Sequence, residues 1–127
     1  MKEALDFLKE NNEVAFATIG NGRPQMRVFQ IMKQSGTTLW FATGPHKRVY
    51  AELQENPAVE ILSRCGNISV RVSGDAVFDV PDDKSLVYFR VEIDRLDYFD
   101  LTPTPPVLRH YDRASGQYVD LNPFGEK

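Results

Sequence analysis

The chain has 127 residues, of which 42% are hydrophobic and 26% are charged, and this fits one globular domain over residues 1–127. Its formal net charge of −3 argues against nucleic acid or an anionic membrane as the main partner. A single cysteine excludes an internal disulfide, and there is neither an apolar leader nor a membrane-length segment, so the expected location is the cytoplasm.

The first third of the chain predicts a short helix followed by β-hairpins. Ala4, Leu5 and Leu8 form one apolar stripe, which is typical of an amphipathic helix from about residue 2 to residue 11. Three runs of β-type composition follow, at residues 14–19, 25–33 and 38–42. Because glycine-containing turns separate them, these strands are expected to pair antiparallel.

A second helix is predicted from Thr43-Gly44-Pro45 to about Gln54, with Thr43 as its cap and Asn56-Pro57 as its end. Further strands are predicted at residues 58–63, 68–78 and 87–93, and a hairpin around residues 112–116. Within the long strand, Ser73-Gly74-Asp75 suggests a bulge. The predicted fold is therefore mainly β, an antiparallel barrel of six or seven strands with a few short helices.

The first candidate site is the basic cluster His46-Lys47-Arg48 near the start of the second predicted helix. A helix N-terminus carries a partial positive charge and free N–H groups, so cations are unfavourable there unless an anion neutralises them. The alternative is that the long side chains are simply solvated and point away from the helix.

The second candidate is Arg27, which strand alternation places on the same face as Phe29 and Ile31. A guanidinium on an apolar face needs a partner. The partner is either a ligand anion such as a phosphate or a carboxylate of the chain itself, and the sequence favours neither.

Familiar catalytic signatures are missing from the sequence. His46, His110 and Cys65 have no metal-ligand spacing, so no metal is expected, and there is no P-loop, nucleophile elbow or dinucleotide fingerprint. Several aromatic residues could stack on a planar ligand, although most of them are expected in the core. Any chemistry is therefore expected to come from a cofactor.

Four motifs in order resemble one known family. They are Pro24-Gln25-Met26-Arg27-Val28-Phe29-Gln30, Trp40-Phe41-Ala42-Thr43, Lys47-Arg48 and Asn56-Pro57. Their order and spacing resemble the pyridoxamine 5′-phosphate oxidase-like FMN-binding split barrels, in particular the small general-stress-protein type. The resemblance covers about residues 6–78 and resumes more weakly over residues 89–123.

The resemblance implies a cofactor, FMN, and a homodimer with its flavin sites at the interface. It implies that Arg27, Lys47 and Arg48 bind the FMN phosphate. It also implies that Val28, Phe29 and Gln30 hold the isoalloxazine ring through their backbone, and Thr43 matches the cofactor-binding threonine at the end of the following strand. Ser69 is the nearest match to a polar residue that reaches FMN from the neighbouring subunit.

Three departures from the oxidases bear on activity. Met32 stands where they carry a lysine for the substrate phosphate, and Arg109-His110 are adjacent where an Arg and a His are one residue apart. Only the short loop Asp79–Ser85 replaces one or two helices, so the chain is either a shortened member or lacks a natural segment. The expected function is an FMN-dependent oxidoreductase on a small organic substrate, not a true pyridoxamine phosphate oxidase. The alternatives are a non-catalytic flavin-binding stress or sensor protein, or the same fold with F420 or haem.

Overall fold

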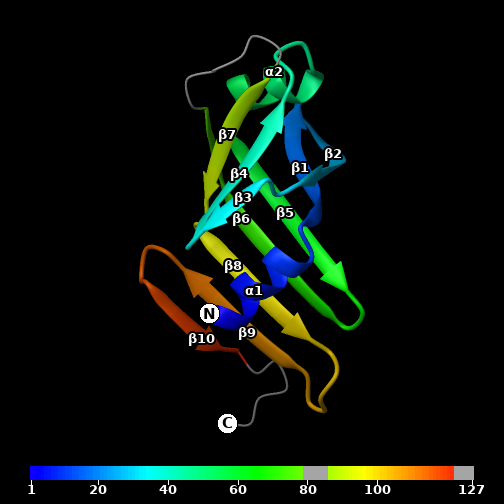
Figure 1. The fold of residues 1–127 in the computed structure, drawn as a ribbon. Helices are drawn as coiled ribbons and strands as arrows, with labels where there is room; N and C mark the ends of the chain where they lie inside the picture. Colours follow the sequence, from blue (N-terminus) through cyan, green and yellow to red (C-terminus); the bar gives the residue numbers. More distant parts are fainter. Residues whose placement is uncertain (79–85, 122–127) are drawn as a thin grey trace.

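The computed structural model describes residues 1–78 and 86–121, which contain two helices and ten strands (Figure 1). In chain order the elements are α1 (Lys2–Glu10), β1 (Glu13–Gly20), β2 (Arg23–Gln30), β3 (Lys33–Ser35), β4 (Thr38–Thr43), α2 (Arg48–Glu55), β5 (Ala58–Cys65), β6 (Ile68–Phe78), β7 (Val87–Glu92), β8 (Arg95–Asp100), β9 (Val107–Asp112) and β10 (Gln117–Asp120). Neither helix is long and apolar enough to span a bilayer among the residues described.

The strands form one antiparallel sheet that bends into an open barrel. Seven strands follow the order β10-β9-β8-β6-β5-β1-β2, and β7 joins β6 to β4, which in turn pairs with β3. The predicted mainly β split barrel is confirmed. More than the six or seven predicted strands are present, because the run at 25–33 divides between β2 and β3 and because β8 has a mixed polar pattern.

The barrel stays open between β2 and β4. Among the described strands, β2 pairs only with β1, and β4 pairs only with β3 and β7. The amide of Met32 donates to the carbonyl of Trp40 at 2.8 Å at one end of this gap. Beyond that bond no ladder joins the two strands, so the gap is the split in the barrel.

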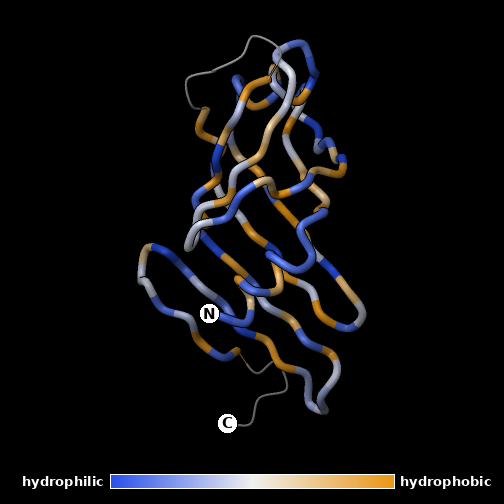
Figure 2. Tube along the Cα trace, viewed as in Figure 1, coloured by the Kyte–Doolittle hydropathy of each residue, from blue (hydrophilic) through white to orange (hydrophobic). Residues whose placement is uncertain are grey.

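Alternation along the strands places one apolar face of each inside the barrel, and Figure 2 shows hydrophobic and hydrophilic residues alternating along them. The centre is aromatic. Phe16 has its ring 5.1 Å from that of Phe41, and Phe41 stacks on Phe89 at 5.4 Å. All three are fully buried. Phe29 meets Phe16 edge-on at 4.9 Å, so this cluster reaches the open side of the barrel.

Gly74 marks the point at which β6 changes partners. β6 pairs with β8 through residues 68–73 and with β7 through residues 76–78. Towards β5 the register runs on without an extra residue, Val59 facing Gly74, so the predicted bulge is wrong. A Cβ at Gly74 would lie 2.5 Å from the carbonyl oxygen of Glu92, and glycine is needed because the backbones approach so closely.

The second helix begins later than predicted. Thr43 is the last residue of β4, where it faces Val87 of β7, and its side chain is buried, so it does not cap the helix. The chain turns through residues 44–47, and α2 starts at Arg48 with Lys47 at the cap position. The prediction failed because pairing with β7 extends β4 through Thr43.

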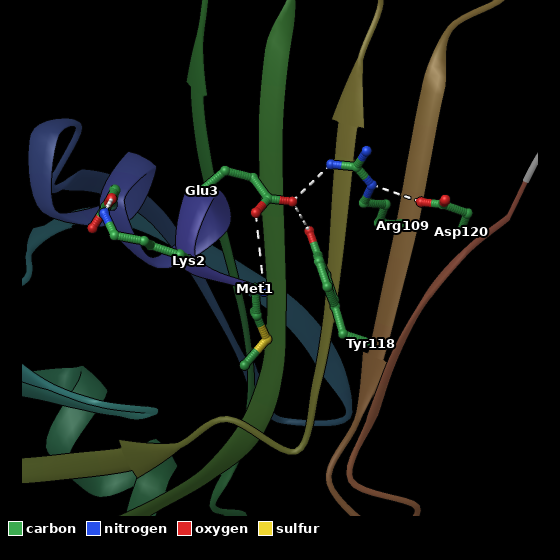
Figure 3. Close-up of polar contacts among 7 residues, drawn as sticks. Met1, Lys2, Glu3, Arg109, Tyr118 and Asp120 are labelled. Carbon is green, nitrogen blue, oxygen red and sulfur yellow. Dashed lines mark hydrogen bonds and ion pairs between the residues drawn. The ribbon is translucent and has the colours of Figure 1, made fainter.

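A polar cluster fastens α1 to the C-terminal hairpin (Figure 3). Oε2 of Glu3 accepts hydrogen bonds from the Tyr118 hydroxyl at 2.7 Å and from Nη1 of Arg109 at 2.8 Å. Arg109 also donates through Nε to Asp120 at 2.6 Å. Partial burial alone would raise the pKa of Glu3, but these hydrogen bonds, led by that of Tyr118, outweigh it and hold the pKa below the usual 4.5.

Tyr118→Phe is expected to lower the free energy of unfolding by about 1 kcal/mol, because it removes one partly exposed hydrogen bond to a carboxylate. A lowered pKa stabilises the fold above the pKa of the unfolded chain, so the wild-type advantage should be present at pH 7 and vanish as the pH falls well below 4.5. Urea denaturation at pH 7 and pH 3 measures both. Tyr111→Phe is the control, since Tyr111 faces Tyr118 and its hydroxyl has no described partner. An equal loss in both variants would contradict the expectation.

Candidate functional site

A hollow of about 740 Å³ lies in the split between β2 and β4 and extends to the start of α2. Its walls come from β2, from the end of β4, from the turn that follows and from the first residues of α2. The lining residues are Gln25, Met26, Arg27, Val28, Phe29, Ala42, Thr43, Gly44, His46, Lys47, Arg48, Val49 and Leu86. Its volume falls within the range of about 300–1,000 Å³ that is usual for small-molecule sites.

Six of the eight residues predicted to bind a cofactor line this hollow. They are Arg27, Val28, Phe29, Thr43, Lys47 and Arg48. The other two do not. Gln30 ends β2 on the outer face of the sheet, opposite Glu13. Ser69 lies on β6 beside a different hollow, which Leu62 and Phe99 also line.

Arg27 forms an ion pair with a carboxylate of its own chain, which answers one question that the sequence left open. Its Nη2 donates to Oε1 of Glu52 at 2.8 Å, and its Nη1 donates to the hydroxyl of Thr18 at 2.8 Å. The Thr18 hydroxyl donates in turn to the same Glu52 oxygen at 2.6 Å. These contacts leave the Arg27 side chain 25% exposed and still part of the hollow wall.

Sequence reasoning missed Glu52, although the chain carries a signal for it. Glu52 lies between the buried residues Val49 and Leu53 on the face of α2 that packs against β1, and its own side chain is only 7% exposed. A carboxylate on an apolar helix face needs a cation, just as Arg27 on its strand needs an anion. Gly20 makes room for it, because a Cβ there would lie 2.7 Å from Oε2 of Glu52.

The basic residues at the start of α2 have no partner within the described chain. His46, Lys47 and Arg48 are exposed, and no described residue forms a side-chain hydrogen bond or an ion pair with them. The first turn of α2 contains no acidic residue, and no side chain caps its N–H groups. This end of the hollow therefore presents positive side chains together with the positive end of a helix.

The opposite wall is an edge strand. Because β2 pairs only with β1 among the described strands, alternate backbone N–H and C=O groups along its other edge are left for a ligand. Val28 is 64% exposed and Met26 is 73% exposed, which is unusual for side chains of this kind. This wall thus offers both backbone polar groups and apolar surface.

The outer face of the large sheet carries a row of polar contacts away from the hollow. Nη2 of Arg71 contacts Asp97 at 3.0 Å, and Nδ1 of His110 contacts the same carboxylate at 2.7 Å. Partial burial raises the pKa of Asp97, but the hydrogen bonds from His110 and Arg71 outweigh it and lower the pKa below its usual value. Arg109, next to His110, points the other way to Glu3, so the two adjacent side chains lie on opposite faces of β9.

The remaining predicted features lie apart from the hollow. Met32 follows β2, is 58% exposed and is not part of the hollow wall. The loop Asp79–Ser85 lies outside the described residues. Within residues 1–78 and 86–121, no three His, Cys, Asp or Glu side chains gather in a way that could hold a metal ion.

Comparison with known proteins identifies what the chain resembles. Residues 1–112 match the family described as pyridoxamine 5′-phosphate oxidase. None of the curated proteins matches the chain. A solved structure of a pyridoxamine 5′-phosphate oxidase-related, FMN-binding protein from Nostoc punctiforme PCC 73102 is similar with a TM-score of 0.81 and 16% identity, over 96% of this chain and 94% of that one.

Two further solved structures are similar at low identity. PhzG from Burkholderia lata 383, in complex with tetrahydrophenazine-1-carboxylic acid, has a TM-score of 0.80 and 16% identity over 96% of this chain and 90% of its own. A Clostridium acetobutylicum protein related to general stress protein 26 of B. subtilis has a TM-score of 0.75 and 14% identity over 91% and 96%. At these identities the likeness establishes the fold.

Proposed function

Because this chain belongs to the pyridoxamine 5′-phosphate oxidase family, we propose that it binds FMN in the hollow between β2 and β4 and acts as an FMN-dependent oxidoreductase on a small organic substrate. The observation that carries the proposal is the composition of the hollow. One end holds Lys47 and Arg48, which have no described carboxylate partner, and the other is an exposed apolar edge strand. A phosphate joined to a flat heterocycle matches both ends.

The net charge of the cationic end matches the charge of a phosphate. Arg27, Lys47 and Arg48 are positive and Glu52 is negative, so the site carries two net positive charges when His46 is neutral. A phosphate monoester carries about two negative charges at neutral pH. The N–H groups at the start of α2 add donors that need no counterion.

The other end suits the ring. The backbone of Val28 and Phe29 lies on the open edge of β2, where it can meet the polar edge of an isoalloxazine, and Thr43 lies across the split on β4. When bound, FMN would supply hydride or electron transfer, and the chain would orient the ring and exclude water from one of its faces. Gln30 is proposed to contribute through its backbone at the end of the same strand.

A homodimer explains the placement of Ser69. In its own chain Ser69 lies three strands from β2, roughly 14 Å away at about 4.8 Å per strand, and so cannot reach the hollow. The outer face from β2 to β6 carries exposed apolar side chains, Met26, Val28 and Leu62, together with charged residues such as Glu60 and Arg64. A two-fold axis along the strands between β1 and β5 would bring Ser69 of the partner subunit over β2 and cover this face.

Mass spectrometry of the ligand released from the purified protein tests the proposal. FMN is the expected mass, with a yellow protein and flavin absorbance, whereas F420, haem or no ligand would contradict it. Reduction of the bound flavin by a nicotinamide donor, followed by reoxidation with a substrate, distinguishes an oxidoreductase from the alternative, a non-catalytic flavin-binding stress or sensor protein. A flavin that only chemical reductants can reduce would favour that alternative.

The protein is expected not to oxidise pyridoxamine or pyridoxine 5′-phosphate. Met32 offers no charge to a substrate phosphate, and Arg109 and His110 face opposite sides of β9, so the two cannot meet one substrate. A phosphate dianion without partners binds poorly and is not positioned for reaction. The assay is formation of pyridoxal 5′-phosphate under oxygen by FMN-loaded protein. Turnover of about 1 s⁻¹ or more would contradict this expectation.

A further inference from the structure

The hydrogen bonds of Arg27 occupy only part of its guanidinium. A guanidinium has five N–H donors, in one fork at its end and another along its side. Nη1 and Nη2 donate to two acceptors, Thr18 and Glu52, that are themselves hydrogen-bonded, so these acceptors hold the end fork. The second Nη1 hydrogen reaches the carbonyl of Phe16 at 3.4 Å. No described residue accepts from Nε–H or from the second Nη2–H, which together form the side fork.

The acceptors of the end fork are themselves rigidly held. Thr18 is 2% exposed on β1 and Glu52 is 6% exposed on α2. Because Glu52 lies one turn after Arg48, its ion pair with Arg27 also joins β2 to the helix whose start carries Lys47 and Arg48. The two halves of the cationic end of the hollow are therefore fixed relative to each other through one buried carboxylate.

We propose that Glu52 and Thr18 are positioning residues, which hold Arg27 so that its Nε–Nη2 fork is directed at the phosphate of the bound flavin. The inference rests on the proposed function and extends it, because it makes discrimination for the phosphate depend on two residues that do not line the hollow. Lys47 and Arg48 attract the phosphate through charges that no carboxylate balances. Arg27, whose charge Glu52 balances, instead orients the phosphate through aligned hydrogen bonds. A bidentate contact needs such alignment, since each of its hydrogen bonds weakens steeply with angle.

The test compares FMN with riboflavin, which lacks only the phosphate. The measured quantity is the dissociation constant of riboflavin divided by that of FMN, so a high ratio means that the protein discriminates in favour of the phosphate. Riboflavin binding shows in each variant that the hollow is intact. Glu52→Ala is expected to lower the ratio by about tenfold or more, the usual effect of a charge-assisted hydrogen bond. Glu52→Gln, which keeps an oxygen acceptor in place, should stay within about threefold of wild type, and Thr18→Val should fall between them.

A double-mutant cycle separates positioning from general structural support. If Glu52 acts through Arg27, then Glu52→Ala in an Arg27→Ala background should leave the ratio unchanged within about twofold. The inference is overturned if Glu52→Ala keeps the wild-type ratio, if it lowers the ratio equally in the Arg27→Ala background, or if Glu52→Gln loses as much as Glu52→Ala. Should Glu52→Ala not fold, Thr18→Val decides alone, and a wild-type ratio there rejects the inference. Wild-type protein that binds neither flavin would instead refute the proposed function.

Discussion

Replacing both Arg27 and Arg48 by alanine should nearly abolish FMN binding. Each single substitution is expected to cost roughly 1.5–3 kcal/mol, or about 10- to 150-fold in dissociation constant, because each removes a charge-assisted hydrogen bond to the phosphate. The double variant should lose more than either single variant, although the two losses need not add, since both side chains contact one group. Quenching of flavin fluorescence during titration measures each constant.

Arg113→Ala is the matched control for this experiment. Arg113 follows β9 and pairs with Asp94 at 2.7 Å, away from the hollow, so its replacement removes one positive charge, as each single substitution does, without touching the site. FMN affinity should then stay at the wild-type value. If the Arg27 and Arg48 double variant bound FMN as tightly as wild type, the phosphate would have to bind elsewhere, and the hollow would be excluded as the site.

Leu62→Asp should convert the protein from a dimer to a monomer and weaken FMN binding with it. Leu62 is 42% exposed on the outer face of β5, between Ala15 of β1 and Arg71 of β6, near the middle of the face that the proposed two-fold axis covers. A carboxylate there would lose its hydration in the interface, and the neighbouring Arg71 is already paired with Asp97, so the change should cost several kcal/mol per subunit. Light scattering at micromolar concentration measures the mass, and a flavin titration measures the affinity.

Val77→Asp is the control for the interface. Val77 is 45% exposed, much like Leu62, but it lies opposite Arg90 in the part of β6 that pairs with β7. This variant should remain a dimer with wild-type FMN affinity. A wild-type protein that is a monomer and still holds FMN tightly would refute the shared site, and a Leu62→Asp dimer would place the interface on another face.

Apolar patterning predicted most of the fold because burial decides it. The strands that the pattern located, such as β5 and β6, alternate between core and surface residues. β8 escaped notice because its outward residues include Arg95 and Asp97, whose charges obscure the short apolar alternation of Leu96 and Tyr98. The late start of α2 was missed because the length of β4 depends on its pairing with β7, which is remote in sequence.

The sequence predicted only part of the candidate site. Arg27 and the cations at the start of α2, which line the hollow, could be recognised from the sequence because a cation on an apolar strand face or at a helix N-terminus needs an anion. The sequence did not connect Arg27 to Glu52, because 25 residues separate them and only the packing of α2 on β1 brings them within 2.8 Å. Ser69 is a different case. Its proposed role depends on how two chains associate, which neither the sequence pattern nor a single chain determines.

The shared strand β6 has a consequence for how the molecule unfolds. Since β6 pairs with β5 and β8 and then, beyond Gly74, with β7, neither group of strands can come apart without disrupting the strand that holds the other. Its inward residues Val70 and Val72 are fully buried in the common core. The two groups of strands therefore form one cooperative unit, and loss of structure on one side of the barrel spreads to the other through the backbone of β6.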